Sequence, residues 1–263
     1  MKLSKERQKQ TGAFYTPKIW ADLAVEYMRA YLPLPLEYYT FYDPTAGEGV
    51  LLEALPENCE KYASTLEEED VKIMQNKGIK AWQFDFLNDD IFHLPHRIFQ
   101  AQMSNKLVVF MNPPYVKLPA EPKSRTQDVY STNDSVECFY YRVGFELSPV
   151  FLCSFNKLDI LQSPKMANFR WFFTNGRPLI KNFISNSKTW GLSGEFPIGF
   201  MMWNMKMTNE EYEQEMNQKM ERWAMLHQSM PSKYTDPKDY KTPEMITKQM
   251  PTSDDIILKK QIE

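Results

Sequence analysis

Residues 107–115 read Leu107-Val108-Val109-Phe110-Met111-Asn112-Pro113-Pro114-Tyr115, an apolar run that ends in an Asn-Pro-Pro-aromatic turn. Such a run is typical of a buried strand. The two prolines fix φ and remove two backbone donors, and the residue before each proline is pushed to extended geometry, so the turn is stiff. We expect the Asn112 side-chain oxygen and a proline carbonyl to act as paired acceptors beside the flat ring of Tyr115. An exocyclic amine on a planar ring, such as adenine N6, fits this arrangement.

Strand-like and helix-like segments alternate on both sides of this turn. Alternation of this kind indicates βαβ units and a parallel sheet, so the fold class is predicted to be α/β. Residues 116–134, rich in Pro, Lys, Ser and Thr, are predicted to form a mobile loop. The predicted strands are residues 38–42, 61–66, 79–84, 107–111, 150–155 and 197–205, and the predicted helices are residues 18–31, 50–55, 71–76, 134–147, 168–174 and 178–185.

Four notable clusters follow predicted strands directly: residues 43–49, Glu67, Asp85-Phe86 and residues 112–115. The carboxyl ends of parallel strands meet at one edge of a sheet, and ligands bind outside that edge. We therefore expect the four clusters to converge on one rim.

The residue types on this rim suit a zwitterionic nucleoside ligand. Gly47 and Gly49, with Ala46, provide a turn that lets the backbone approach a ligand closely. Asp43, just before the turn, would repel a phosphate but could bind an amino group. This combination favours a zwitterionic cofactor over a dinucleotide.

The second and third strand ends add acceptors for a nucleoside. Glu67 closes the second strand, where an acid commonly accepts hydrogen bonds from ribose hydroxyls. The acids at residues 68–70 are interpreted as a solvated helix start. Asp85 could accept from an adenine amino group while Phe86 covers the ring; a loop acid followed by a core phenylalanine is the alternative.

With these motifs in place, the chain resembles S-adenosylmethionine-dependent N6-adenine DNA methyltransferases of the gamma-type motif order, as found in restriction-modification systems. Thr11-Gly12-Ala13-Phe14-Tyr15-Thr16-Pro17 looks like their N-terminal cofactor motif. Asp43-Pro44-Thr45-Ala46-Gly47-Glu48-Gly49 resembles their glycine-rich motif, and Asp85-Phe86 their adenine-contacting pair. Asn112-Pro113-Pro114-Tyr115 matches their catalytic motif, and the likeness becomes diffuse further along the chain.

The resemblance implies the Rossmann-like, seven-stranded, mostly parallel sheet of class I methyltransferases, with an antiparallel last strand and S-adenosyl-L-methionine as cofactor. The expected substrate is an adenine flipped out of duplex DNA. The expected catalytic residues are Asn112, Pro113, Pro114 and Tyr115, and the expected substrate-binding residues are Tyr115, Lys117 and Phe196. The expected cofactor-binding residues include the strand-end acids. They are Phe14, Tyr15, Thr16, Pro17, Asp43, Pro44, Ala46, Gly47, Gly49, Glu67, Asp85 and Phe86.

Three other functions stay open on the sequence. The same turn occurs in enzymes that methylate the amide of protein glutamine, and related turns occur in RNA adenine methyltransferases. A catalytically weak subunit that binds DNA or a partner is the third. The Phe14-Tyr15-Thr16-Pro17 segment before the glycine-rich turn favours the DNA enzymes.

Composition limits the remaining classes. The formal net charge of −3 gives no global signature for nucleic-acid binding. Cys59, Cys138 and Cys153 lack CxxC spacing and the chain has 3 histidines, so we predict neither a disulfide framework nor a metal site. There is no apolar run near about 18 residues and no signal-peptide pattern, so we expect a cytoplasmic protein of prokaryotic or phage-type context with no membrane contact.

Three regions are predicted along the chain. Residues 1–10 are expected to form a mobile arm, residues 11–206 the catalytic domain, and residues 207–263 a helical or irregular extension with an amphipathic helix at residues 208–230. That extension is shorter than the usual target-recognition domain of the resembled family. The sequence therefore predicts a fragment, low specificity, or a separate specificity or partner subunit.

Overall fold

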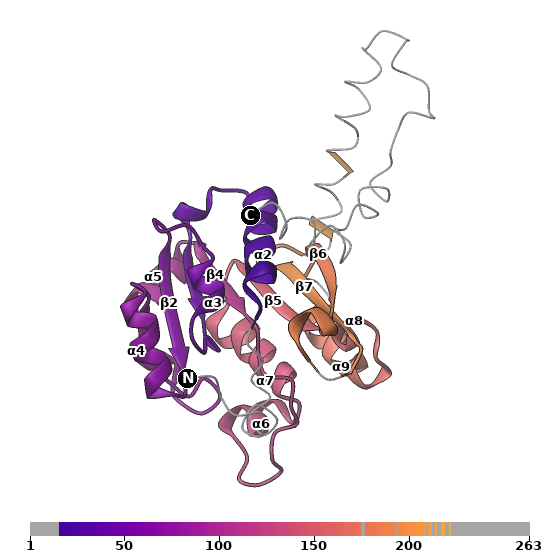
Figure 1. Ribbon diagram of the computed structural model, residues 1–263. Helices are drawn as coiled ribbons and strands as arrows, with labels where there is room; N and C mark the ends of the chain where they lie inside the picture. The colour runs from indigo at the N-terminus through magenta and orange to yellow at the C-terminus, as the bar shows by residue number, and fades with distance from the viewer. Residues whose placement is uncertain are drawn as a thin grey trace, which may run out of the picture. The chain divides into compact units, whose positions relative to one another are not determined.

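In the computed structural model the chain forms a seven-stranded sheet, in the order β3-β2-β1-β4-β5-β7-β6 (Figure 1). The structure describes residues 16–174, 177–192 and 194–208, with residues 210, 211, 214, 217, 218 and 221. The strands are β1 (Thr40–Asp43), β2 (Glu60–Thr65), β3 (Lys80–Gln83), β4 (Leu107–Met111), β5 (Phe151–Lys157), β6 (Leu179–Asn186) and β7 (Pro197–Asn204).

Strand directions match the expected topology. β1 pairs in parallel with β2 and β4, β2 pairs in parallel with β3, and β4 pairs in parallel with β5. β7 runs antiparallel to both β5 and β6. The predicted seven-stranded, mostly parallel sheet with an antiparallel last strand is confirmed.

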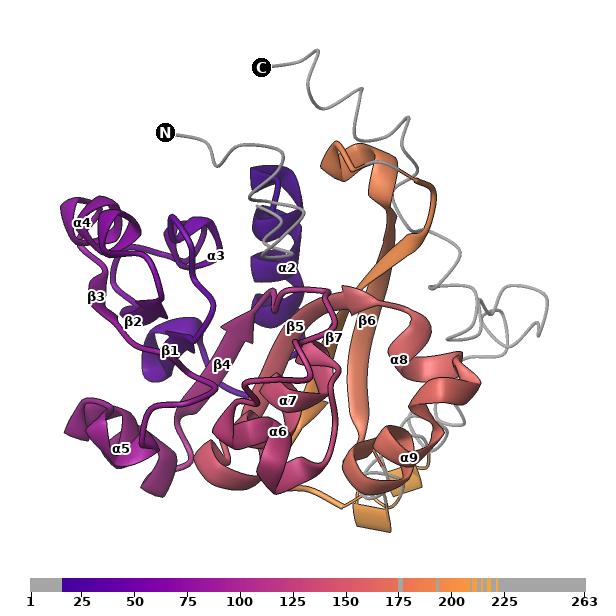
Figure 2. The same ribbon diagram turned by 90° about the horizontal axis from the view of Figure 1, so that it is seen from below.

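Helices cover both faces of the sheet. Figure 2 shows α2, α3 and α4 on one face and α5, α7 and α9 on the other. π-helical turns, Arg142–Leu147 and Arg170–Thr174, continue α7 and α9. The helices are α2 (Lys18–Tyr31), α3 (Val50–Glu53), α4 (Glu68–Asn76), α5 (His96–Met103), α6 (Arg125–Tyr130), α7 (Ser135–Tyr141), α8 (Asp159–Gln162) and α9 (Ala167–Phe169).

The core is divided by the pleat of the strands. Successive strand residues point to opposite faces, so the buried neighbours Phe41 and Tyr42 of β1 serve different layers. Tyr42 belongs to the apolar cluster shared with α5, α7 and α9. On the α2 side, Phe183 of β6 packs against Trp20 and Tyr27, with ring centroids 6.0 Å and 4.9 Å apart. With both faces covered, the strand ends are the edge left for a ligand.

The predicted helix at residues 178–185 is wrong, because this segment is the edge strand β6. It pairs with β7, and toward its end buried Phe183 and Ser185 alternate with exposed neighbours, which is the period of a strand. Contacts from α2 and pairing with β7 decide the conformation, and neither is local in sequence.

The predicted mobile loop at residues 116–134 is also wrong in part, because it contains α6. Ser124 begins this helix with a capping box: its Oγ accepts from the Gln127 amide and the Gln127 side chain accepts from the Ser124 amide. Thr126 Oγ1 donates to the Leu87 carbonyl over 2.7 Å, which ties the segment to the turn after β3.

The chain divides into two units, Met1–Met207 and Thr208–Glu263. In the second unit, the six described residues from 210 onward are helical. The predicted arm at residues 1–10 and most of the predicted helix at residues 208–230 lie outside the described residues. Among the described helices, none has the length and apolar character needed to cross a membrane.

Candidate functional site

A cavity of about 360 Å³ lies at the carboxyl ends of β1 to β4. All four strand-end clusters contribute to its wall, so the predicted convergence on one rim is confirmed. Pro17 begins α2 as its N-cap, and Phe14 and Tyr15 lie outside the described residues. The predicted site residues that line this cavity are Thr16, Asp43, Pro44, Ala46, Gly47, Glu67, Asp85, Phe86, Asn112, Pro114 and Lys117.

The glycine-rich turn after β1 uses left-handed backbone at both glycines. Gly47 has φ of 50° and Gly49 has φ of 82°, a region that side chains rarely adopt. Gly47 lines the cavity. Gly49 faces the opposite way: a Cβ there would meet Met74 Cγ at 2.8 Å, so this glycine lets the turn pack on α4.

Asp43 is buried at the end of β1 with 1% of its surface exposed. Its Oδ1 accepts from the amide and the hydroxyl of Thr45, over 2.8 Å and 3.0 Å. Burial nevertheless raises the pKa of its carboxyl to about 7. A ligand cation beside this carboxyl would offset the cost of burying the charged form.

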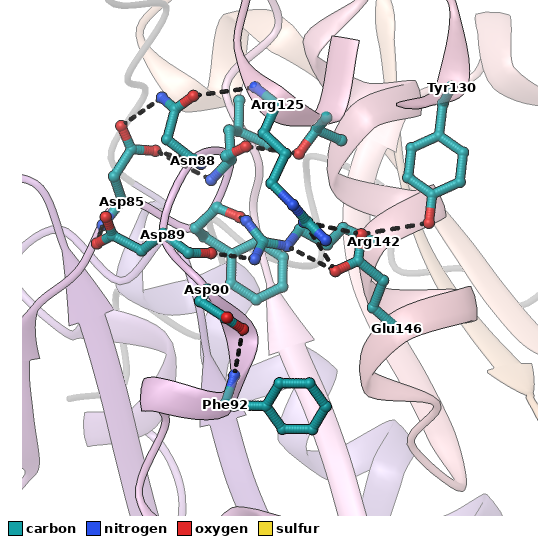
Figure 3. Close-up of polar contacts among 12 residues, drawn as sticks. Asp85, Asn88, Asp89, Asp90, Phe92, Arg125, Tyr130, Arg142 and Glu146 are labelled. Atoms are coloured by element: carbon teal, nitrogen blue, oxygen red, sulfur yellow. Dashed lines mark hydrogen bonds and ion pairs between the residues drawn. The ribbon is translucent and has the colours of Figure 1, made fainter. Parts of the chain in front are cut away.

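The turn after β3 is organised by Asp85 itself (Figure 3). Its Oδ1 accepts from the amides of Leu87 and Asn88 over 3.0 Å and 3.2 Å, and its Oδ2 accepts from Asn88 Nδ2 over 2.7 Å. Asp85 lines the cavity, and a carboxylate has about four acceptor positions, so a ligand donor can still be accommodated.

Two stacked phenylalanines form an apolar wall of the same cavity. Phe86 lies parallel to Phe139 of α7, with ring centroids 5.8 Å apart and an angle of 3° between the planes. Both rings are largely buried. Phe86 was predicted to be either a core ring or a ring that covers a ligand. The structure shows that it packs in the core and also lines the cavity.

A buried arginine holds this turn from behind. The Arg142 guanidinium has no exposed surface and donates to the carbonyls of Phe86 and Asp89, as Figure 3 shows. It lies 5.2 Å from the centre of the Phe86 ring, and its Nε is 3.4 Å from Glu146. Glu146 also pairs with Arg125 at 3.0 Å.

The Asn-Pro-Pro-Tyr turn lies beside this cavity. Asn112 Nδ2 donates to Thr16 Oγ1 over 3.0 Å, and the Tyr115 hydroxyl donates to Asn112 Oδ1 over 2.6 Å. Burial raises the pKa of Tyr115 well above its usual value, so the phenol remains a donor at neutral pH. Buried Ser135 braces the turn: its Oγ lies 2.5 Å from the Pro114 carbonyl and accepts from the Val116 amide.

A second cavity, of about 210 Å³, is lined by the last residue of the same turn and the two residues that follow it. Tyr115, Asp134, Asn156 and Lys157 are in its wall, and Lys117 lines both cavities. Asn156 is 1% exposed, and its Oδ1 has no hydrogen-bond partner among the described residues. Because a buried polar atom without a partner is costly, this wall suits a ligand that carries a donor.

Phe196 does not line either cavity, yet it lies close to Tyr115 through a shared neighbour. The ammonium of Lys157 is 4.9 Å from the centre of the Phe196 ring and 5.7 Å from the centre of the Tyr115 ring. The two aromatic residues predicted to hold the substrate are thus brought together across the end of β5.

Sequence reasoning missed several of these residues. Phe139, Ser135 and Arg142 come from α7 and its π-helical continuation, and Asn156 and Lys157 from the end of β5. The N-cap Asp134 was a signal for the start of α7, but no periodicity shows which face of that helix meets the cavity.

Metal ligands do not gather within the described part of the chain. No group of three or more His, Cys, Asp or Glu residues there could hold an ion. The cysteines Cys59, Cys138 and Cys153 are buried free thiols.

Comparison with known proteins identifies the fold class. No family model matches the sequence, and no curated protein matches it. Among solved structures, the methyltransferase subunit of a type I restriction-modification system from Streptococcus thermophilus aligns over 74% of this chain and 45% of its own, with 18% identity and a TM-score of 0.55. The type IIG restriction endonuclease BpuSI aligns over 75% of this chain and 26% of its own, with 16% identity and a TM-score of 0.55.

A third neighbour is a protein from Listeria monocytogenes described as a class I S-adenosylmethionine-dependent methyltransferase. It aligns over 72% of this chain and 60% of its own, with 10% identity and a TM-score of 0.52. The fold is that of class I methyltransferases. The chain spans less than two thirds of the length of each of these three proteins.

Proposed function

We propose that the protein is an S-adenosylmethionine-dependent methyltransferase that acts on N6 of adenine in DNA. The observation that carries the proposal is the position of the Asn-Pro-Pro-Tyr turn between two cavities. Asn112 and Pro114 line the larger cavity, and Tyr115 lines the smaller one. A transferase needs such an arrangement, with a donor site and an acceptor site that meet at one group.

The larger cavity fits S-adenosylmethionine in size and chemistry. Its volume of about 360 Å³ is in the range of small-molecule sites. Buried Asp43 suits the amino group of the methionine moiety, and Glu67 suits the ribose hydroxyls. The Phe86 and Phe139 rings offer an apolar wall for the adenine, and Asp85 an acceptor for its amino group. When bound, the cofactor supplies a methyl group on a positively charged sulfur.

The chain's own residues then orient the acceptor amine. Asn112 Oδ1 and the Pro113 carbonyl accept the two N6 hydrogens, which draws the amine lone pair out of conjugation with the ring and aims it at the methyl group. Thr16 Oγ1, 3.0 Å from Asn112 Nδ2, fixes which way the amide faces. Ser135 holds the turn rigid through the Pro114 carbonyl. The excess proton leaves with water after transfer.

The smaller cavity receives the target base in this proposal. The base stacks on Tyr115, a contact worth about 1–3 kcal/mol by analogy with single-strand stacking. Phe196, whose ring contacts the same Lys157 ammonium as the Tyr115 ring does, supplies a second aromatic surface for the base. Lys117, exposed on the rim of both cavities, is placed to contact the DNA backbone.

Two neighbours, a methyltransferase subunit of a type I restriction-modification system and a type IIG restriction endonuclease, support DNA as the substrate class. Duplex DNA hides the adenine lone pair, so the target base must leave the stack. A chain with net charge −3 is poorly suited to bind DNA tightly alone. We therefore include a separate specificity or partner subunit in the proposal.

A labelling experiment tests the proposal. The full chain is incubated with methyl-labelled S-adenosylmethionine and with unmethylated DNA, RNA or protein, and products are digested and identified. We expect label in N6-methyladenine of DNA, at a site that sequencing then defines. Asn112→Ala should abolish the label while S-adenosylhomocysteine still binds, and Asn76→Ala, an exposed residue at the end of α4, should change neither. Label only in protein or only in RNA would refute DNA as the substrate.

A further inference from the structure

The ammonium of Lys157 lies over the two rings that are proposed to hold the target base. Lys157 is the last residue of β5 and lines the smaller cavity. Its Nζ is 4.9 Å from the Phe196 ring centre and 5.7 Å from the Tyr115 ring centre. It forms no salt bridge with a carboxylate of the described residues. Two aromatic faces are thus its main contacts, and each is worth only about 0.5–2 kcal/mol.

This position is the one that a stacked base would need. A flat ring that stacks on Tyr115 and meets Phe196 excludes a cation from the same ring faces. Base stacking of about 1–3 kcal/mol per base is comparable with the two cation–π contacts together, so a base can exchange with the ammonium on these rings. Because the lysine stem is flexible, the charge can move to the edge of the base without leaving the cavity.

At the base edge the ammonium can only donate hydrogen bonds. It therefore needs an acceptor, and adenine offers the ring nitrogens N1, N3 and N7. Asp134 lies in the same wall. Burial raises the pKa of Asp134, and the positive charge of Lys157 acts against this rise. A carboxyl group thus lies in the same cavity wall as the ammonium.

We propose that Lys157 is a specificity-determining residue that reads an unsubstituted ring nitrogen of the target base, an inference that rests on the proposed function. In the free protein the ammonium occupies the aromatic slot. With the target base bound, it donates a charge-assisted hydrogen bond to that nitrogen. A base without an acceptor there still displaces the ammonium from the rings but returns no hydrogen bond to it, so it is a poorer substrate.

The test uses duplexes that carry the methylation site defined by the labelling experiment. The target adenine is replaced in turn by 1-deaza-, 3-deaza- and 7-deazaadenine, each of which exchanges one ring-nitrogen acceptor for a C–H group. We expect kcat/KM of the wild type to fall about tenfold or more for one of the three analogues, as for loss of a hydrogen bond to a charged group. Lys157→Met should lose as much on adenine itself and nothing further on that analogue. Lys157→Arg should keep the discrimination.

Lys106→Met is the matched control, because Lys106 is exposed and precedes β4 at the opposite end of the strand. It should behave as the wild type on all four bases. Circular dichroism and thermal melting of each variant show whether it is folded. If Lys157→Met rejects the same analogue as strongly as the wild type, Lys157 does not read the base.

A phosphate contact gives a different pattern. Duplex binding measured against NaCl concentration would then weaken equally for all four bases in Lys157→Met, and the salt slope would fall by about 1. That result would overturn the inference and leave the proposed function standing. If the wild type does not methylate DNA at all, the proposed function fails first and the inference fails with it.

Discussion

The hydroxyl of Tyr115 donates a 2.6 Å hydrogen bond to Oδ1 of Asn112, the oxygen that is proposed to accept from the target amine. The turn therefore holds its own acceptor in place before any substrate arrives. An amide oxygen has two lone pairs, so one can keep the Tyr115 hydroxyl while the other takes the amine. The Tyr115 ring and the Tyr115 hydroxyl thus have separable roles.

We expect Tyr115→Phe to keep methyl transfer within a few-fold of the wild type, because the stacking ring remains. Tyr115→Ala should lower kcat/KM by about 5- to 150-fold, the equivalent of about 1–3 kcal/mol of lost stacking. Steady-state kinetics on DNA measure both. Equal losses in the two variants would show that the hydroxyl, and not the ring, is the important group.

Asp43 makes stability depend on pH in an unusual direction for a carboxyl group. Its pKa in the folded protein is about 7, above the usual 3.8 of an aspartic acid, because burial disfavours the charged form. The folded state therefore keeps a proton that the unfolded chain releases as the pH rises through about 4, and stability falls until the pH passes about 7. The whole loss is on the order of 4 kcal/mol at about 1.36 kcal/mol per pKa unit.

Urea unfolding of the ligand-free protein at pH 5 and pH 8 measures the larger part of this loss, about 2–3 kcal/mol. Asp43→Asn should lack that contribution to the decline. The affinity for S-adenosylhomocysteine should rise with pH in the wild type, since only the carboxylate attracts the amino group, and should be flatter in Asp43→Asn. Identical pH profiles for the two proteins would exclude Asp43 as the titrating group.

The sequence predicted the rim because its signals are local. Asp43, Glu67, Asp85 and Asn112 each end or follow a short predicted strand at the start of a turn, and parallel topology then brings the strand ends together. Thr16 also lines this cavity, and its place in the site was predicted only from the resemblance of residues 11–17 to a family motif. These predictions needed no knowledge of how helices pack.

Residues that helix packing and strand pairing bring to the site could not be predicted from local sequence signals. Phe139 lines the cavity because α7 packs on the sheet, where the Tyr140 hydroxyl meets Ser154 Oγ of β5. Lys157 meets Phe196 because β7 pairs with β5. The edge strand β6 was mistaken for a helix because Phe183 and Ser185 are its only buried residues, too few to show a period of two. Long-range pairing decided these positions.

Gly49 and Gly78 offer a matched pair for the glycine-rich turn. Both have left-handed backbone, with φ of 82° and 75°. A Cβ on Gly78 meets nothing within 4 Å, whereas one on Gly49 meets Met74 Cγ at 2.8 Å. Gly78→Ala should cost about 1–2 kcal/mol from backbone strain alone, and Gly49→Ala about 1–3 kcal/mol more from crowding. Urea unfolding measures both, and equal costs would show that α4 can give way at Met74.

Arg142 and Arg125 both pair with Glu146, yet their removal should have very different effects. Arg142 is fully buried and donates to the Phe86 and Asp89 carbonyls, whereas the Arg125 side chain is 47% exposed. Arg142→Met leaves two carbonyls without their donor, so we expect a loss of about 2–5 kcal/mol in unfolding free energy. Arg125→Met removes a half-exposed pair worth about 1 kcal/mol or less.

The two variants also separate stability from ligand binding at the Asp85-Phe86 turn. Without the Arg142 hydrogen bonds to its carbonyls, the turn that lines the larger cavity is no longer fixed. S-adenosylhomocysteine should therefore bind Arg142→Met more weakly than Arg125→Met at a temperature where both are folded. Urea unfolding gives the first quantity and isothermal titration calorimetry the second. If Arg142→Met is destabilised but binds the ligand as tightly as Arg125→Met, then Phe139 and the Asp85 hydrogen bonds alone keep the turn in place.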